Sequence, residues 1–274
     1  MADLRAYVQR LQTLASQPRA EAGAPAKAKA APVEVVDFAK WGAISRKPVS
    51  PLRKVIGHRM SESWTKVARV TQFDEADITA LMELRKTNQA GYEAKGARLT
   101  LTPLALKAVV TTLKRHPIFN SSLDEAAGEI VFKQYYHIGV AVDTEAGLLV
   151  PVLRDVDKKD LLQLSREVED LAMRARERKL SLDEMKGGTF TISNQGGIGG
   201  GHFTPIVNAP EVAILGLGRG GWKAVVKDKQ IQQRLMLPLA VSYDHRVMDG
   251  GVAARFTVDL VQALENFGED EVRI

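Results

Sequence analysis

The order of apolar patterns along the chain is the feature that most constrains its fold. Segments with helical spacing are interspersed with short β-rich segments, and no regular repeat of strand and helix connects them. A regular repeat would indicate a doubly wound sheet or a barrel. The irregular order, with mostly strand-like segments in the last third, predicts an α/β fold: a two-layer sandwich with a mixed β-sheet.

Local signals place several of these elements. Ser50 followed by Pro51 predicts a helix start, because a proline at the first helical position loses no hydrogen bond. Further helices are expected at 160–179 and at about 251–266, and a capping box at Ser181 and Glu184. Strands are expected at 129–142, 148–153, 189–193, 211–218, 222–226 and 235–242, with a hairpin turn at 227–230.

The first 36 residues differ from the rest of the chain. Residues 1–14 carry an apolar stripe at helical spacing, whereas residues 15–36 are rich in alanine, proline and charge, which is typical of a linker. We expect the main domain to span 37–274. A helix at the very first residue suggests that the chain starts inside a preceding module.

Composition excludes several classes of protein. Hydrophobic residues make up 45% and charged residues 26%, as in ordinary globular proteins. Without cysteine the chain has no disulfides or thiolate metal sites, and its histidines lack metal-ligand spacing, so we expect no metal. The net charge of +5 arises in residues 1–60, where it accompanies a linker rather than a nucleic-acid motif. We expect no nucleic-acid binding, and no membrane span, because there is no long apolar run.

The segment 240–251, AVSYDHRVMDGG, is the most informative for function. His245 follows a predicted strand and precedes a helix, so it is well placed to face a cleft and accept a proton near pH 7. The charges of Asp244, Arg246 and Asp249 allow either a carboxylate that orients the ring or an Arg–Asp pair that holds the turn. From these residues alone, such a histidine more often has a structural role.

Five ordered segments resemble the dihydrolipoamide acyltransferases of 2-oxo acid dehydrogenase complexes. Residues 242–250 (SYDHRVMDG) resemble the DHRxxDG signature of that family. The other matches are FNSSL at 119–123, GLLVPVLRD at 147–155, FTISN at 190–194 with the glycine-rich run to 201, and TPIVNAPEVAILG at 204–216. They cover roughly residues 45–274, and residues 4–11 resemble the last helix of the peripheral-subunit-binding module. The resemblance implies a fold shared with chloramphenicol acetyltransferase.

The resemblance also implies the chemistry, which is thioester exchange between dihydrolipoamide and coenzyme A without an acyl-enzyme. His245 would remove the thiol proton, the Ser193 hydroxyl would stabilise the oxyanion, and Asp249 would steady His245 or the turn. In the family the histidine and the serine come from neighbouring subunits of a trimer. Coenzyme A or acetyl-coenzyme A is then a substrate, and the lipoyl group is carried on a separate module absent from this chain. The sequence does not identify the residues that bind the coenzyme A nucleotide.

The implied partners follow from the complex. They are the 2-oxo acid dehydrogenase and dihydrolipoamide dehydrogenase components, lipoyl domains, and further copies of this chain in a homotrimer that could assemble into a larger cage. The charged C-terminus, 269–274, differs from the leucine-rich ends of cage-forming members, although Ile274 could still plug a contact between trimers. A bacterial cytoplasm is expected in preference to the mitochondrial matrix.

Several alternatives stay open. Serine at 193, where succinyl-transferring relatives tend to carry threonine, favours acetyl transfer, with a branched-chain acyl group second. Ser193 could instead only end a strand by bonding local backbone, and 196–201 is expected to be a tight turn rather than a phosphate loop. One alternative is a catalytically silent scaffold paralogue, but the presence of His245, Ser193 and Asp249 argues against it. Another is a free-standing acetyltransferase of small hydroxyl compounds, but the linker argues against it, because a tethered design suits a carrier-bound substrate.

Overall fold

The computed structural model describes residues 36–145 and 147–274. The chain divides into two compact units, 1–48 and 49–274. The described part of the first unit contains one short 3₁₀ turn, η1 (Phe38–Trp41), which begins where the Asp37 side chain accepts the Ala39 N–H. The predicted segment 1–14 and nearly all of the predicted linker 15–36 lie outside the described residues, so both stay predictions.

The second unit contains helices and strands in mixed order. Its helices are α2 (Pro51–Lys66), α3 (Thr79–Ala94), α4 (Leu101–Arg115), α5 (Leu161–Arg176), α6 (Gly250–Glu265) and α7 (Glu269–Val272). Its strands are β1 (Arg69–Asp77), β2 (Ser121–Asp124), β3 (Glu129–Phe132), β4 (Ile138–Val140), β5 (Val152–Leu153), β6 (Phe190–Asn194), β7 (Ala213–Leu217), β8 (Gly221–Lys227) and β9 (Gln230–Asp244). Short 3₁₀ turns lie at η2 (Pro117–Asn120), η3 (Val156–Lys158) and η4 (Asp183–Met185).

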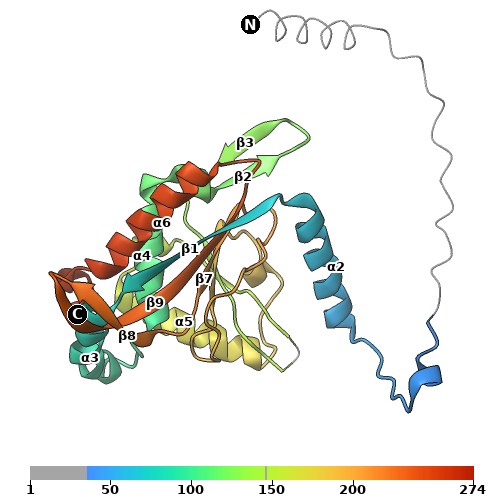
Figure 1. The fold of residues 1–274 in the computed structure, drawn as a ribbon, viewed down its shortest axis with the longest axis horizontal. Helices are drawn as coiled ribbons and strands as arrows, with labels where there is room; N and C mark the ends of the chain where they lie inside the picture. The colour runs from blue at the N-terminus through green and yellow to red at the C-terminus, as the bar shows by residue number, and fades with distance from the viewer. Residues whose placement is uncertain (1–35, 146) are drawn as a thin grey trace, which may run out of the picture. The chain divides into compact units, whose positions relative to one another are not determined.

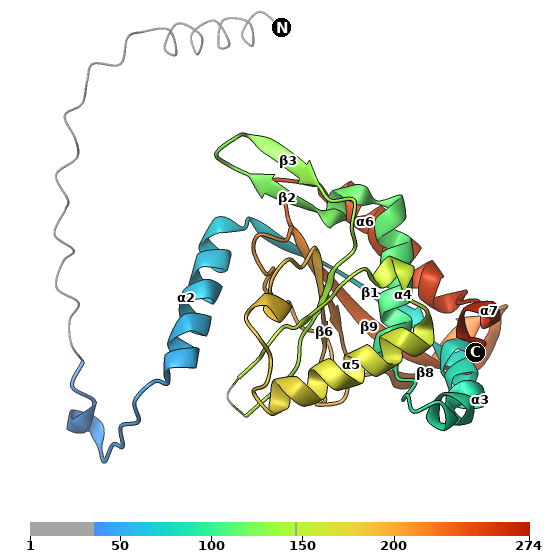
Figure 2. The ribbon, with the colours of Figure 1, turned by 180° about the vertical axis from the view of Figure 1, so that it is seen from behind.

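Seven strands form one sheet in the order β1-β9-β7-β6-β4-β5, with β8 paired to the first half of β9 (Figure 1). The pairs β4–β6 and β6–β7 are parallel, and the other pairs are antiparallel. The sheet is therefore mixed, as the irregular order of elements predicts. The strands β2 and β3 form a separate hairpin that projects from the body (Figures 1 and 2).

Helices α4, α5 and α6 cover one face of the main sheet, with α5 in front in the rear view (Figure 2). Aromatic side chains fill the space between the layers: the rings of Phe119 and Phe256 stack at 3.9 Å between centroids, and Phe190 of β6 lies 6.2 Å from Phe256. All three are fully buried. The predicted two-layer α/β sandwich with a mixed sheet is confirmed.

Capping and turn residues set the element boundaries. The Ser50 hydroxyl accepts the Arg53 N–H at the start of α2, as the Ser-Pro pair predicts. A reciprocal capping box between Asp160 and Gln163 begins α5. Asp228 and Lys229 both have positive φ, which is the geometry that a two-residue hairpin turn requires. The predicted turn at 227–230 is confirmed.

The prediction of one continuous strand over 129–142 is wrong. Residues 129–132 pair with β2 in the small hairpin, while 138–140 pair with β5 and β6 in the main sheet. Between them, Asn120 Nδ2 donates to the carbonyls of Lys133 and Tyr135, which holds this stretch in a non-strand path. An alternating sequence pattern does not show which partner each half will pair with.

The loop that follows β6 covers the other face of the sheet. Phe203 packs against β7 at Gly216, where a Cβ would come within 2.8 Å of the Phe203 ring. The guanidinium of Arg69 on β1 donates to the Pro205 carbonyl and stacks on the Trp64 ring at 4.2 Å.

Candidate active site

The turn at the end of β9 is held by an arginine–aspartate pair. Arg246 donates from Nη2 to Asp244 Oδ2 at 2.7 Å, from Nε to both carboxylate oxygens, and from its backbone N–H to Oδ1. The Asp244 side chain is buried, and its hydrogen bonds raise the pKa of Arg246, which stays charged. Of the two arrangements that the sequence allows, the Arg–Asp pair holding the turn is the one formed.

His245 sits between these two residues with its backbone fixed and its ring exposed. Its N–H donates to the Ala68 carbonyl at 2.9 Å, and its ring centroid lies 5.9 Å from that of Tyr243. A rigid backbone with an accessible imidazole is the arrangement that a general base requires. The ring is not sealed in the interior, which would have excluded such a role.

Asp249 begins α6. Its Oδ1 accepts the Val252 N–H at 2.9 Å, which is the usual side-chain bond at a helix N-cap. Within residues 36–145 and 147–274 its side chain makes no hydrogen bond to His245. The structure thus places Asp249 where it steadies the turn that carries His245, and a direct role in catalysis stays a prediction.

Ser193 lies near the end of β6 on the face of the sheet away from the helices. Its neighbour Ile192 is part of the core, and successive strand residues face opposite sides. Ser193 is 7% exposed, and its hydroxyl makes no hydrogen bond in the described part of the chain. The alternative that Ser193 only bonds local backbone therefore has no such bond to support it. A sheltered hydroxyl whose proton is not already bonded is available to donate to an oxyanion.

The glycine-rich run after Ser193 forms the predicted tight turn. Asn194 Oδ1 accepts the Gly196 N–H, and Gly199 has a φ of 120°, which only glycine adopts readily. The Arg219 N–H donates to the Gly200 carbonyl. The run is fixed by its own backbone bonds, so it is a connection between β6 and the covering loop.

One chain does not bring His245 and Ser193 together. Ser193 is paired with Gly216, which is paired with Ala240, five residues before His245 on β9. At about 3.3 Å per residue and about 4.8 Å per strand, the two Cα atoms are roughly 19 Å apart. Side chains cannot bridge that distance at one reacting bond. A site that uses both residues needs a second copy of the chain.

The other histidines lie away from this turn: His58, His116, His137 and His202. His116 Nε2 lies 2.7 Å from Asp259 Oδ2, a contact that joins the end of α4 to α6. His137 Nδ1 accepts the Asp155 N–H, and burial lowers the pKa of His137. Across the described ranges no group of three or more His, Asp or Glu residues is arranged to hold a metal ion.

Sequence reasoning missed Glu211, which is buried beside β6. The Thr191 hydroxyl donates to Glu211 Oε2 at 2.6 Å, and burial raises the pKa of Glu211 to about 7. Lys133 lies nearby, and burial lowers its pKa. The available signal was a charged residue two positions before the apolar strand 213–217. No helix between residues 36 and 274, with residue 146 set aside, is long and apolar enough to cross a membrane.

Residues 42–269 match the family model of the 2-oxoacid dehydrogenases acyltransferase catalytic domain. The acetyltransferase components of the pyruvate dehydrogenase complexes of Pseudomonas aeruginosa and Azotobacter vinelandii are each 50% identical to this chain, over 89% and 93% of its length. The chain spans only 44% and 40% of those relatives. A solved structure of the Azotobacter vinelandii dihydrolipoamide acetyltransferase is 51% identical, with a TM-score of 0.84 over 86% of this chain and 97% of that one.

The spacing of three residues links this site to that structure. The Azotobacter vinelandii work concerns the role of a serine, a histidine and an asparagine in the catalytic mechanism; the histidine follows the serine by 52 positions and the asparagine follows the histidine by four. Ser193, His245 and Asp249 have the same separations. The last position differs in type, with a carboxylate here in place of an amide.

Proposed function

Because the chain belongs to the 2-oxoacid dehydrogenase acyltransferase family, we propose that it transfers an acetyl group between dihydrolipoamide and coenzyme A. The observation that carries the proposal is the exposed imidazole of His245 on a rigid turn. His245 follows Ser193 in the sequence by 52 positions, as the histidine follows the serine in the Azotobacter vinelandii enzyme. The runner-up is transfer of a branched-chain or succinyl group by the same mechanism.

The first step of the proposed mechanism makes a nucleophile. A thiol with a pKa of about 8.5 is mostly protonated at neutral pH, so it needs a base. His245 takes the proton from the thiol of coenzyme A or dihydrolipoamide, and the thiolate attacks the carbonyl carbon of the acyl thioester. The new carbon–sulfur bond forms as the carbonyl π electrons move onto oxygen.

The second step stabilises and then collapses that oxyanion. The hydroxyl of Ser193 from a neighbouring chain donates a hydrogen bond to the oxygen, which typically lowers the barrier by about 3–4 kcal/mol. As the carbonyl reforms, the original carbon–sulfur bond breaks, and the protonated His245 returns its proton to the departing thiolate. Both acyl transfer directions use the same atoms, and no acyl-enzyme forms.

The assembly and partners belong to the same proposal. The separation of Ser193 and His245 within one chain supports a site at a subunit boundary, and we infer a homotrimer that could build into a cage. The solved cubic core of a pyruvate dehydrogenase multienzyme complex is 50% identical to this chain, with a TM-score of 0.84 over 86% of it. The proposed partners are lipoyl domains and the 2-oxo acid dehydrogenase and dihydrolipoamide dehydrogenase components, in a bacterial cytoplasm.

The domain division is also proposed. Residues 37–274 would form the catalytic domain, 15–36 a linker and 1–14 the remnant of a peripheral-subunit-binding module. Coenzyme A and the lipoyl group act as substrates, and the mechanism requires no metal. The family match over residues 42–269 supports the proposed extent of the catalytic domain.

A substrate comparison tests the proposal. The chain is supplied with free dihydrolipoamide and acetyl-, succinyl- or isobutyryl-coenzyme A, and the acylated dihydrolipoamide is measured. We expect acetyl transfer to be the fastest. Faster isobutyryl or succinyl transfer would replace the acyl group in the proposal, and no transfer from any of the three would contradict the acyltransferase function itself.

A further inference from the structure

The turn that carries His245 is anchored by backbone hydrogen bonds on both of its sides. The His245 N–H donates to the Ala68 carbonyl at 2.9 Å, and the Asp244 N–H donates to the Val212 carbonyl at 2.8 Å. Ala68 directly precedes β1, and all nine residues of β1 are paired with β9. Val212 lies just before β7, and the pairing of β7 with β9 begins only at Ala213. The Val212 side of the anchor therefore depends on contacts outside the strand pairing.

The buried side chain of Glu211 supplies such a contact. Its carboxyl group reaches β6, where Oε2 accepts the Thr191 hydroxyl at 2.6 Å, and Oε1 accepts from Asn208 Nδ2 at 3.4 Å. Gly188 leaves room for this group, because a Cβ at that position would come within 2.6 Å of Oε1. A buried carboxyl has lost its hydration, so the groups that bond it set its position. The residue before Val212 is thereby fixed to β6.

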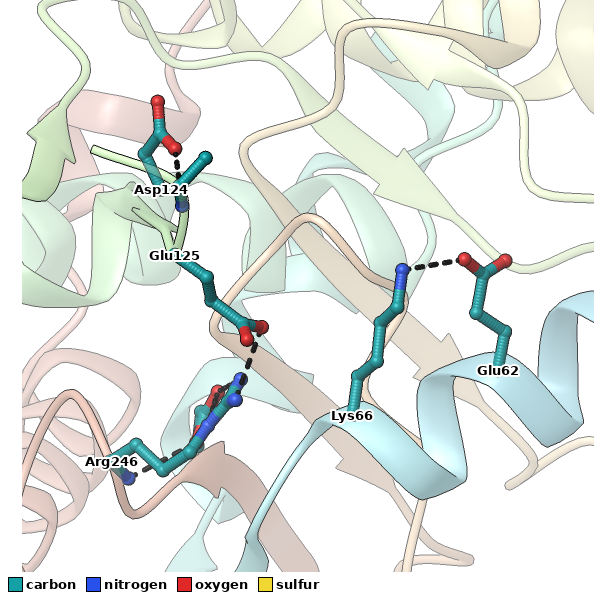
Figure 3. Close-up of polar contacts among 7 residues, drawn as sticks. Glu62, Lys66, Asp124, Glu125 and Arg246 are labelled. Carbon is teal, nitrogen blue, oxygen red and sulfur yellow. Dashed lines mark hydrogen bonds and ion pairs between the residues drawn. The ribbon is translucent and has the colours of Figure 1, made fainter. Parts of the chain in front are cut away.

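The β2–β3 hairpin also contacts this region, but through exposed bonds. The Ser122 hydroxyl donates to the carbonyl of Pro210, the residue before Glu211, at 2.6 Å. At the tip of the hairpin, Glu125 accepts from Arg246 Nη1 at 3.1 Å (Figure 3). Exposed bonds and ion pairs compete with water and contribute little, whereas the bond that Glu211 makes to β6 is buried. The buried carboxyl is thus the contact expected to locate the segment before β7.

The strand that carries Ser193 depends much less on this contact. β6 lies inside the sheet, between β4 and β7, and Ser193 is paired with Gly216 of β7. Thr191 is paired on both sides, with Gly139 and with Ile214. Loss of the bond from its hydroxyl should therefore leave β6 in place and release only the segment before β7.

We propose that Glu211 is a positioning residue for His245. Its bond to Thr191 holds the Val212 carbonyl in place, and that carbonyl fixes the backbone of Asp244, the residue before the base. The inference rests on the proposed function, in which His245 is the base, and adds to it a residue that touches no substrate. A base must lie within hydrogen-bond distance of the thiol, so a small displacement of the turn lowers the rate.

Mixed assemblies test the proposal, because in them the two reacting groups come from different chains. His245→Ala and Ser193→Ala chains are produced together, and acetyl transfer to dihydrolipoamide is measured. A boundary with both groups intact takes its histidine from the Ser193→Ala chain and its serine from the His245→Ala chain. Thr191→Val is then added to one chain or to the other. It removes the hydroxyl that bonds Glu211 and keeps the β-branched shape of the side chain.

We expect Thr191→Val to lower the recovered activity about tenfold in the Ser193→Ala chain, which supplies the base, and less than about twofold in the His245→Ala chain. Glu211→Leu should give the same pattern. Glu211→Gln should stay near the activity of the starting mixture, because its amide oxygen accepts the same bond. Thr112→Val, which removes the hydroxyl of a buried threonine on α4, is the control and should lower the activity in neither chain. Light scattering checks that each assembly stays intact.

An equal loss in both placements would overturn the proposal by showing that the bond serves only the general stability of the fold. A loss confined to the His245→Ala chain would overturn it by assigning the bond to Ser193, and no loss in either chain would contradict it as well. A starting mixture without activity would instead contradict the shared site of the proposed function. In that case the Glu211→Leu chain with both reacting groups intact is measured, and a kcat equal to that of wild type would contradict the positioning role.

Discussion

The ends of β9 and β6 carry the two proposed reacting groups and are built in opposite ways. At the end of β9 the backbone N–H of His245 is hydrogen-bonded to Ala68, and its neighbours Asp244 and Arg246 form an ion pair. The imidazole itself is exposed. At the end of β6 the Ser193 side chain is buried, and its hydroxyl is without a partner among the described residues. The base is presented on a rigid turn, and the hydroxyl is kept in a sheltered position.

This difference is what the proposed site requires, because each end supplies one of its two groups. An exposed imidazole lacks an oxyanion donor, and a sheltered hydroxyl lacks a base. The strand register separates them by roughly 19 Å in one chain. In the proposed site, a boundary between two copies would bring the exposed imidazole of one chain to the sheltered hydroxyl of the other.

Removing the base gives the largest expected effect at the β9 end. His245→Ala should lower turnover by at least about 100-fold, because the thiol then has no positioned proton acceptor. His58→Ala, an exposed histidine on α2, is the matched control and should keep wild-type turnover. Near-full activity of His245→Ala, measured as acetyl transfer to dihydrolipoamide, would rule out the proposed base.

Removing the donor tests the β6 end. Ser193→Ala should lower kcat by about 100- to 1,000-fold and leave the KM values nearly unchanged, because the hydroxyl acts on the oxyanion rather than on bound substrate. Ser181→Ala, an exposed serine, is the control. A change in KM alone would contradict the oxyanion role.

Glu211 adds a buried carboxyl to the β6 region, where it accepts a hydrogen bond from Thr191. Burial raises its pKa from 4.5 to about 7, so folding favours the protonated acid. The resulting stabilisation is present below about pH 4.5 and is lost as the pH rises through about 7. Between about pH 4.5 and about pH 7 the wild-type free energy of unfolding should therefore fall by about 2–3 kcal/mol. The Glu211→Gln chain has no carboxyl at this position and should not show this fall.

Denaturant unfolding of both chains between about pH 5 and pH 8 measures this difference. Glu129→Gln, at an exposed position on β3, is the control and should keep the wild-type pH dependence. Parallel stability curves for wild type and Glu211→Gln would show that the buried carboxyl does not titrate in this range.

Asp249 gives the smallest expected effect, at the β9 end. Asp249→Ala should lower the free energy of unfolding by about 1 kcal/mol, because α6 loses its N-cap bond. Asp249→Asn should retain both the cap and most of the activity, since an amide oxygen accepts the same hydrogen bond. An equal loss of stability in the two variants would show that the cap bond does not matter.

The sequence predicted features that depend on local chemistry. The helix start at Ser50 and the turn at 227–230 are confirmed, because capping and left-handed turn residues act within a few positions. The Arg246–Asp244 pair was one of two arrangements that the sequence left open. The fold class followed from the order of elements and from the family motifs together.

Features that depend on distant partners could not be predicted. Residues 129–142 divide between two sheets because β2 captures one half and β6 the other. The buried state of Glu211 depends on packing against β6, and the distance between Ser193 and His245 depends on the strand register. None of these is encoded in a short window of sequence.

Co-expression of two inactive chains tests the shared site most directly. His245→Ala and Ser193→Ala chains are produced together, the mixed assemblies are purified, and acetyl transfer to dihydrolipoamide is measured. A site built from two copies predicts recovery to about a quarter of wild-type activity, the share of boundaries that random mixing supplies with both intact residues. Mixed assemblies that stay as inactive as either variant alone would contradict it.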